Sequence, residues 1–108
     1  MDSPVYYSRR GGAKVGSLSA TWPFGRIEIS QGSVTVRVMG AAKALSVAEV
    51  LRVQPLGFFA TDGDAGVRIF FRGKHWEEYV DFYSMSARRE VLAELRQAGF
   101  NVEEPPGS

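Results

Sequence analysis

A single segment with helical periodicity stands at the C-terminal end of this chain, and the apolar patterns before it alternate with a period of two. The apolar face of that segment, residues 87–98, consists of Val91, Leu92, Leu95 and Ala98. One helix cannot cover both faces of a sheet, so the strands must bury their apolar faces against each other. The sequence therefore predicts a mainly β, antiparallel barrel or sandwich with one helix over an open end.

Both ends of this helix carry recognisable signals. Ser86 is a favourable N-cap residue, and Gly99 is placed to end the helix in a left-handed conformation. Phe100 follows at the position whose side chain contacts Leu95 in a Schellman ending. We expect burial of the apolar face to contribute roughly 1.5–3 kcal/mol for each large side chain.

Seven strands are expected before the helix, and the pattern is clearest in the second and third. Ile27 and Ile29 alternate with polar residues, and three valines do the same in residues 33–39. Gln31 and Gly32 between them fit a two-residue hairpin in which glycine supplies a positive φ. The expected strands are residues 17–22, 25–30, 33–39, 43–45, 50–58, 67–72 and 77–84.

The length and composition describe one domain. The chain has 108 residues, of which 44% are hydrophobic and 23% charged, and a chain of this size buries about two-thirds of its surface without a disulfide or metal. Residues 1–13 lack a periodic pattern and are predicted to be a flexible N-terminal arm. Residues 101–108 are predicted to be a disordered polar tail, which leaves residues 14–100 as the domain.

The order of seven strands and a closing helix resembles that of pleckstrin-homology-like (PH-like) domains. The similar stretches are residues 32–37, 46–53 and 80–83, within a region, residues 32–99, that looks like bacterial members of this superfold and like GRAM domains. The resemblance implies a seven-stranded split barrel capped by the helix, and a non-enzymatic role in binding phosphoinositides, peptides or proteins. Another small helix-capped β-barrel is the alternative.

Phosphoinositide-binding members of this superfold carry an early Lys and two basic residues that alternate on the second strand. Lys14 and Arg26 match the first two positions, and Glu28 stands where the third cation is found. The resemblance therefore does not imply phosphoinositide binding by the usual route.

Two arginines are predicted to lie opposite each other. If the hairpin turns at Gly32, Arg26 is the cross-strand neighbour of Arg37, on the face away from the isoleucines. Like charges directly opposite are destabilising and call for a carboxylate, such as that of Glu28, or for an external anion. Together with Lys43, the pair predicts a site for an anion, an anionic lipid or an acidic peptide. The alternative interpretation is that solvated arginine stems splay apart or pair with Glu28.

Trp22, Pro23 and Phe24 are predicted to lie in the first hairpin connection. Two large aromatic residues in a loop predict a tip that contacts a partner or a membrane. The alternative is that they fold back and close a corner of the barrel, with Pro23 fixing the bend.

Charge argues against a dedicated nucleic-acid binder, because 13 basic and 12 acidic residues leave a net charge of only +1. Residues 1–54 carry seven basic and three acidic residues, and residues 55–108 carry six and nine. One interpretation is a dipolar surface that orients a partner or a second copy of the chain, as in a homodimer, and the alternative is a charged, solvated face. Arg52, Arg68 and Arg72 are expected to form a basic strip on the exterior.

The sequence gives little support for catalysis or for metal binding. The chain has no Cys and one His, His75, whose neighbours Glu77 and Glu78 do not supply the three or four converging ligands that a metal needs. We therefore predict no metal, no cofactor and no enzymatic activity. The sequence has no apolar run near the ~18 residues of a membrane span, which predicts a cytoplasmic location. Ten arginines against three lysines are typical of high-GC bacterial coding.

The function predicted from the sequence is that of a non-catalytic adaptor that recognises a protein or peptide partner. Contact through residues 22–24, or strand addition at an exposed sheet edge, would provide the binding surface, and the resemblance to PH-like domains implies that this edge is the one beside the helix. Binding of an anionic lipid or small anion through Arg26, Arg37 and Lys43 is the alternative.

Overall fold

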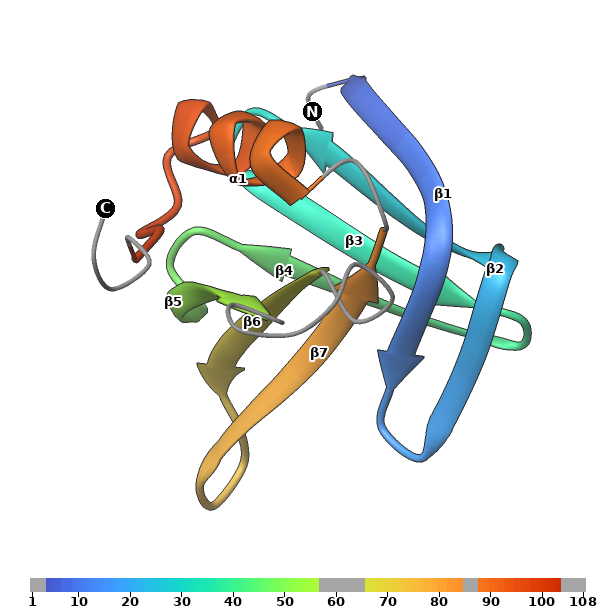
Figure 1. Ribbon diagram of the computed structural model, residues 1–108. Helices are drawn as coiled ribbons and strands as arrows, with labels where there is room; N and C mark the ends of the chain where they lie inside the picture. The colour runs from blue at the N-terminus through green and yellow to red at the C-terminus, as the bar shows by residue number, and fades with distance from the viewer. Residues whose placement is uncertain (1–3, 57–65, 85–87, 104–108) are drawn as a thin grey trace.

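The computed structural model describes residues 4–56, 66–84 and 88–103. Within these ranges the chain forms an antiparallel sheet of seven strands in the order β4-β3-β2-β1-β7-β6-β5, followed by one helix (Figure 1). The sheet does not close on itself, so β4 and β5 are its two edges. The elements are β1 (Val5–Val15), β2 (Leu18–Ser30), β3 (Ser33–Val38), β4 (Ala41–Ser46), β5 (Val50–Leu56), β6 (Gly66–Arg72), β7 (Glu77–Tyr83) and α1 (Arg88–Gln97).

The number of strands is as predicted, but the first two are assigned differently. Residues 18–22 and 25–30 of the first two predicted strands belong to one continuous strand, β2, and the additional strand is β1, which begins at Val5. The prediction of a flexible arm is therefore wrong for residues 5–13. The last two residues of the predicted strand 50–58 lie outside the described residues, as does the predicted N-cap, Ser86.

Two glycines explain why β1 shows no regular apolar pattern. Gly11 and Gly25 are cross-strand neighbours in β1 and β2. A Cβ atom on Gly11 would overlap the carbonyl oxygen of Tyr83, and one on Gly25 would lie 2.7 Å from the backbone nitrogen of Ala13. The strands approach closely here because β1, already paired with β2, begins to pair with β7 at Gly12. The glycines thus let β1 belong to both halves of the sheet.

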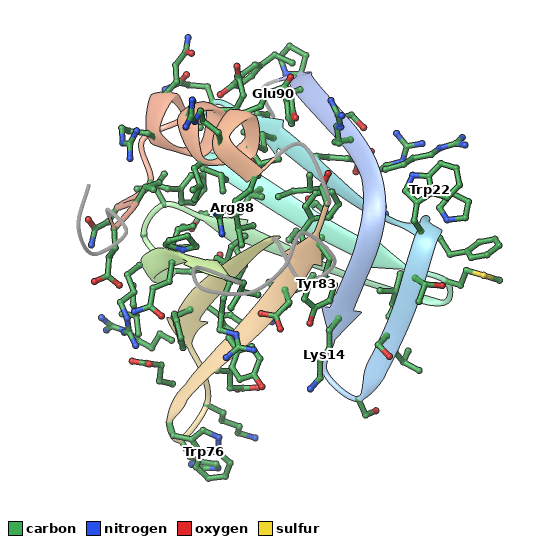
Figure 2. All side chains as sticks on the ribbon, viewed as in Figure 1. Lys14, Trp22, Trp76, Tyr83, Arg88 and Glu90 are labelled. Carbon is green, nitrogen blue, oxygen red and sulfur yellow. The ribbon has the colours of Figure 1, made fainter. Side chains whose placement is uncertain are left out.

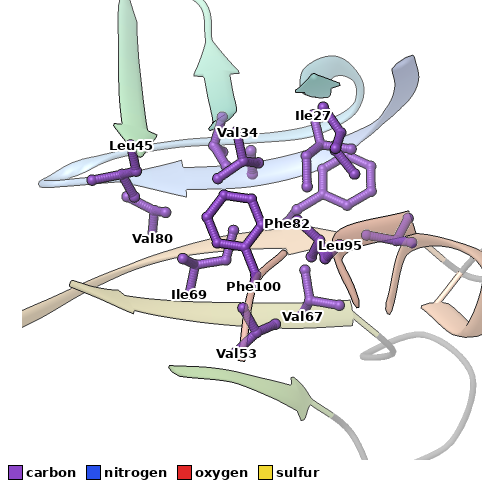
Figure 3. Close-up of a cluster of buried hydrophobic side chains, with 14 of the residues drawn as sticks. Ile27, Val34, Leu45, Val53, Val67, Ile69, Val80, Phe82, Leu95 and Phe100 are labelled. Carbon is purple, nitrogen blue, oxygen red and sulfur yellow. The ribbon is translucent and has the colours of Figure 1, made fainter. Parts of the chain in front are cut away.

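The two halves of the sheet face each other across one apolar core (Figure 3). Ile27, Val34 and Leu45 enter it from one side, and Val53 and Ile69 from the other (Figure 3). All five side chains are at most 2% exposed. The period-two pattern of the sequence therefore identified the buried face correctly.

The helix covers the open end of this core. Val91, Leu92 and Leu95 are buried, and α1 contacts β5 and β6. On the other half of the sheet, the Tyr6 hydroxyl donates a hydrogen bond to the carbonyl of Glu94 at 3.0 Å. The helix therefore connects both halves of the sheet, as predicted for a closing element.

The predicted Schellman ending is confirmed. Gly99 has a φ of 106°, and its N–H donates to the carbonyl of Arg96 at 3.1 Å. The N–H of Phe100 donates to the carbonyl of Leu95 at 3.1 Å, and the Phe100 side chain is buried. This turn directs the chain back toward β5.

Residues 101–103 lie along the outer edge of β5. The N–H of Val53 donates to the carbonyl of Asn101, and the N–H of Glu103 donates to the carbonyl of Val53, both at 2.8 Å. The prediction of a disordered tail is thus wrong for residues 101–103, and residues 104–108 lie outside the described ranges. No helix in the described part of the chain has the length and apolar character of a membrane span.

Candidate functional site

Three arginines lie side by side on the outer face of β1, β2 and β3. Arg26 is the cross-strand neighbour of Arg37, as predicted, and Arg10 is its neighbour on the other side. Adjacent strands are about 4.8 Å apart, so the three side chains start from a line of about 10 Å across the sheet. We call Arg10, Arg26 and Arg37 the arginine row.

The positive charge of the arginine row is only partly balanced by neighbouring carboxylates. The Nε of Arg37 donates to Oε1 of Glu28 at 2.6 Å. Arg26 donates from Nη1 to the hydroxyl of Ser8 at 2.7 Å, which is a neutral partner. Among the described residues, no carboxylate lies within ion-pair distance of Arg10 or Arg26. Three positive charges thus face one negative charge, and like charges in adjacent positions repel.

Large apolar side chains are exposed beside the arginine row. Trp22 is 70% exposed, Phe24 56% and Met39 69%. Phe24 and Arg26 occupy alternate positions of β2 and so point to the same face. Trp22 lies further along the same strand, where the pairing with β1 is irregular. Figure 2 shows Trp22 projecting from β2 away from the core. We call Trp22, Phe24 and Met39 the apolar patch.

The predicted position of residues 22–24 is wrong, although the prediction of exposure holds. They lie inside β2 and not in a hairpin connection, because the turn between β1 and β2 is at Gly16 and Ser17. The exposed side chains of Trp22 and Phe24 also exclude the alternative that both fold back to close a corner of the barrel.

An open hollow of about 400 Å³ joins the two features. Its lining includes all of the arginine row together with Pro23, Phe24 and Met39. Guanidinium groups bind carboxylates and phosphates with paired hydrogen bonds, and neighbouring apolar atoms exclude water from such contacts. The arrangement is therefore suited to an anionic group attached to an apolar body.

Lys43 does not belong to this site. Along β4, Ala42 is the neighbour of Arg37, whereas Lys43 is the neighbour of Val36 on the opposite, core-facing side of the sheet. Its Nζ lies 4.8 Å from the centroid of the Phe71 ring. The predicted grouping of Lys43 with the arginine pair fails because alternate residues of a strand point to opposite faces.

Two of the three arginines in the predicted basic strip on the later strands, Arg52 and Arg68, are paired with acids, whereas Arg72 has no carboxylate within ion-pair distance among the described residues. Arg68 donates to both oxygens of Asp81, at 2.8 and 3.0 Å, and Asp81 is 0% exposed. Arg52 donates to both oxygens of Glu77 at 3.0 and 2.6 Å. Arg52 and Arg68 therefore differ from Arg10 and Arg26, which have no such carboxylate partner among the described residues.

The buried Asp81 also accepts a hydrogen bond of 2.9 Å from the hydroxyl of Tyr83. Burial, and then the contact with this carboxylate, raise the pKa of Tyr83 to about 12. The Arg68 guanidinium stacks on the Tyr79 ring, 4.0 Å from its centroid. Arg68, Asp81 and Tyr83 thus have partners within the cluster, so the cluster is part of the scaffold.

Sequence reasoning missed Arg10 and Met39. Arg10 stands just before two glycines that interrupt the apolar pattern, and only the pairing of β1 with β2 reveals its place in the row. The run Val5-Tyr6-Tyr7 is rich in strand-forming residues and was the available signal for β1. Met39 joins the site through the turn between β3 and β4.

In the ranges that the structure describes, no group of three His, Cys, Asp or Glu side chains is placed to hold a metal ion. His75 is exposed in the connection between β6 and β7, where its ring centroid lies 5.8 Å from that of Trp76 (Figure 2). Comparison with protein families, with curated proteins and with solved structures finds no match for this chain.

Proposed function

We propose that this chain is a non-catalytic binding module that recognises an acidic segment of a partner protein. The ligand lies on the arginine row and the apolar patch. The observation that carries the proposal is that Arg10 and Arg26 have no carboxylate within ion-pair distance in the described residues, beside three exposed large apolar side chains.

The two features contribute in different ways. The arginine row attracts acidic partners over a distance and selects against basic ones, which mainly affects the rate of association and the specificity. Burial of the apolar patch contributes roughly 25 cal/mol per Å² of apolar surface. Trp and Arg side chains are also the residue types that most often dominate binding energy at protein interfaces.

A labelled peptide tests this proposal. The probe is a short fluorescein-labelled peptide in which Glu and Val alternate, and binding is followed by fluorescence anisotropy at low salt, where charge attraction is strongest. We expect Arg26→Ala to weaken binding about five- to tenfold, which corresponds to the loss of one charge-assisted contact at an accessible site.

The matched control is Arg72→Ala, since Arg72 is exposed on the outer face of β6 and lies outside the arginine row. It should bind the peptide as the unaltered protein does. Absence of peptide binding by the unaltered protein, or equal binding by the Arg26 and Arg72 variants, would contradict the proposal.

Binding to an anionic membrane is the second candidate. The observation that favours it is the exposure of Trp22 on β2, the strand that also carries Arg26, because Trp prefers the boundary between apolar chains and polar headgroups. Sedimentation with phosphatidylserine vesicles, compared with phosphatidylcholine vesicles, separates the two candidates. Binding to the anionic vesicles without binding to the peptide would make the lipid the ligand.

The fold assignment belongs to the same proposal. A PH-like split barrel is supported by the strand order and by the helix that closes one end of the core. Domains of this shape are mostly binding modules, which agrees with the function proposed. A bacterial origin is proposed from the excess of arginine over lysine, and a cytoplasmic location from the lack of a long apolar run in the sequence.

A further inference from the structure

The two edge strands of the sheet, β5 and β4, differ in how well their outward backbone groups are protected from pairing with another strand. On β5, residues 101–103 pair with Val53, and Asn101 also donates from its side chain to the carbonyl of Leu51 at 3.4 Å. Pro55 lacks an N–H, which further protects this edge from pairing with another strand. The edge beside the helix, where the resemblance to PH-like domains implied peptide addition, is therefore already covered at Val53.

The hairpin between β3 and β4 determines which groups the other edge presents. Its two-residue turn, Met39-Gly40, is closed by Val38 and Ala41, whose backbone groups point at each other. Since the direction alternates along an antiparallel strand, Ala42, Ala44 and Ser46 direct their N–H and C=O groups outward.

The hydrogen bonds of Ser46 agree with this alternation of backbone direction. Its N–H donates to Oε1 of Glu49, and its carbonyl accepts from the N–H of Glu49, both at 3.0 Å. Both groups of Ser46 thus point outward, as the alternation requires, and both are satisfied within the chain.

Ala42 and Ala44 have no such partner. In the described part of the chain, neither residue makes a backbone hydrogen bond on the outer side of β4. The usual protections of an edge are weak here, because β4 contains no proline and its one charged residue, Lys43, is turned toward Phe71. Four backbone groups are therefore available over three residues.

This edge adjoins the arginine row. Ala42 is the cross-strand neighbour of Arg37. The row of neighbouring residues that runs across the sheet through Arg10, Arg26 and Arg37 therefore ends on β4 at the small side chain of Ala42. A strand added beside β4 would place its own outward side chain next in that line, about 10 Å from the backbone of Arg37. In the structure the Arg37 side chain is directed to Glu28 on β2, so it has to exchange this partner for the acid of the added strand in order to reach over the small Ala42.

We infer that the acidic segment of the partner adds to β4 as a further strand, hydrogen-bonded to Ala42 and Ala44, with an acidic side chain beside Arg37. The inference rests on the proposed function, because it states how that acidic segment is held. A second copy of this chain fits less well. Its own β4 would present Ala42 and Ala44 again, without an acid for the arginine row.

Substitution of Ala44 tests the inference with the alternating Glu-Val peptide. Ala44→Pro removes the outward N–H, and an edge strand accepts proline where its N–H faces solvent. We expect this variant to weaken peptide binding at least about fivefold, the effect of one lost backbone hydrogen bond. Ala44→Val keeps the N–H and should bind within about twofold of the unaltered protein, as surface substitutions usually change little.

Amide hydrogen exchange measured by NMR provides a readout that does not depend on any substitution. Addition of the peptide should slow exchange at the amides of Ala42 and Ala44. Unchanged exchange at both amides in a saturated complex would overturn the inference, even if the proline variant failed to fold.

The outcomes separate this inference from the proposed function. If the peptide binds, Arg26→Ala weakens it and Ala44→Pro does not, strand addition is overturned and the binding surface remains. If the unaltered protein does not bind the peptide at all, both are overturned.

Discussion

Removal of Arg68 should destabilise the fold strongly, because it leaves a buried charge without its partner. Arg68 lies on β6 and Asp81 on β7, and the two are cross-strand neighbours joined by two hydrogen bonds. The Asp81 side chain is 0% exposed, whereas that of Arg68 is 32% exposed. Arg68→Met keeps most of the apolar stem and removes only the charge and the two donors.

The size of the effect follows from this burial. Removing one partner of a buried ion pair costs about 3–5 kcal/mol. Since Arg68 is partly solvated, we expect a loss at the lower end, about 3 kcal/mol. For a domain near this size each 1 kcal/mol lowers Tm by about 4–8 °C, so Tm should fall by roughly 12 °C or more.

Urea and thermal unfolding followed by circular dichroism measure this loss. The control is Arg72→Met on the same strand and the same outer face, which should change stability by less than about 0.5 kcal/mol. Combining Arg68→Met with Asp81→Asn should recover part of the loss, because no charge is then buried without a partner. Equal effects of the Arg68 and Arg72 variants would refute the assigned role of the buried pair.

Two further predictions concern the helix and the tyrosines. Leu95→Ala should destabilise the fold by about 2–5 kcal/mol in urea unfolding, because the side chain is 0% exposed, and a cost below about 1 kcal/mol would show that the helix does not close the core. Tyr83 has its pKa raised to about 12 in the fold against an ordinary value of 10.0, so folding favours its protonated form. Its contribution to stability is therefore complete below pH 10 and is lost as the pH rises toward 12. Ultraviolet titration of tyrosine should lose the component near pH 12 in Tyr83→Phe, and an unchanged titration curve would contradict the assignment.

The sequence was sufficient for most of the fold because the period-two pattern is strong where one face of a strand is buried. Ile27 and Ile29 identified β2, and the helical spacing of Val91 and Leu95 identified α1. Gly99 identified the end of the helix, because a helix commonly ends in a left-handed residue and glycine adopts that conformation most readily.

The first strand was not predicted because its sequence is governed by close backbone approach and not by side-chain burial. Gly11 and Gly25 are needed where β1 meets β2 and β7, and glycine in a sequence usually indicates a loop. The error had a direct consequence for the site, since Arg10 could not be placed beside Arg26 without β1.

The candidate site was therefore predicted in part. The opposition of Arg26 and Arg37 followed from a two-residue turn at Gly32, which fixes the register. The position of Lys43 did not follow, because its face depends on where the next turn begins. Arg10 joins the site only through the long-range pairing of β1 with β2, and no local pattern near Arg10 indicates that Arg26 is its neighbour.

Mapping of the ligand surface by NMR tests the central claim most directly. When the alternating Glu-Val peptide is added to labelled protein, the largest changes in amide chemical shift should fall on Phe24 and on the arginine row. Changes centred instead on Arg68 and its neighbours on β6 and β7, or no changes at saturating peptide, would contradict the account.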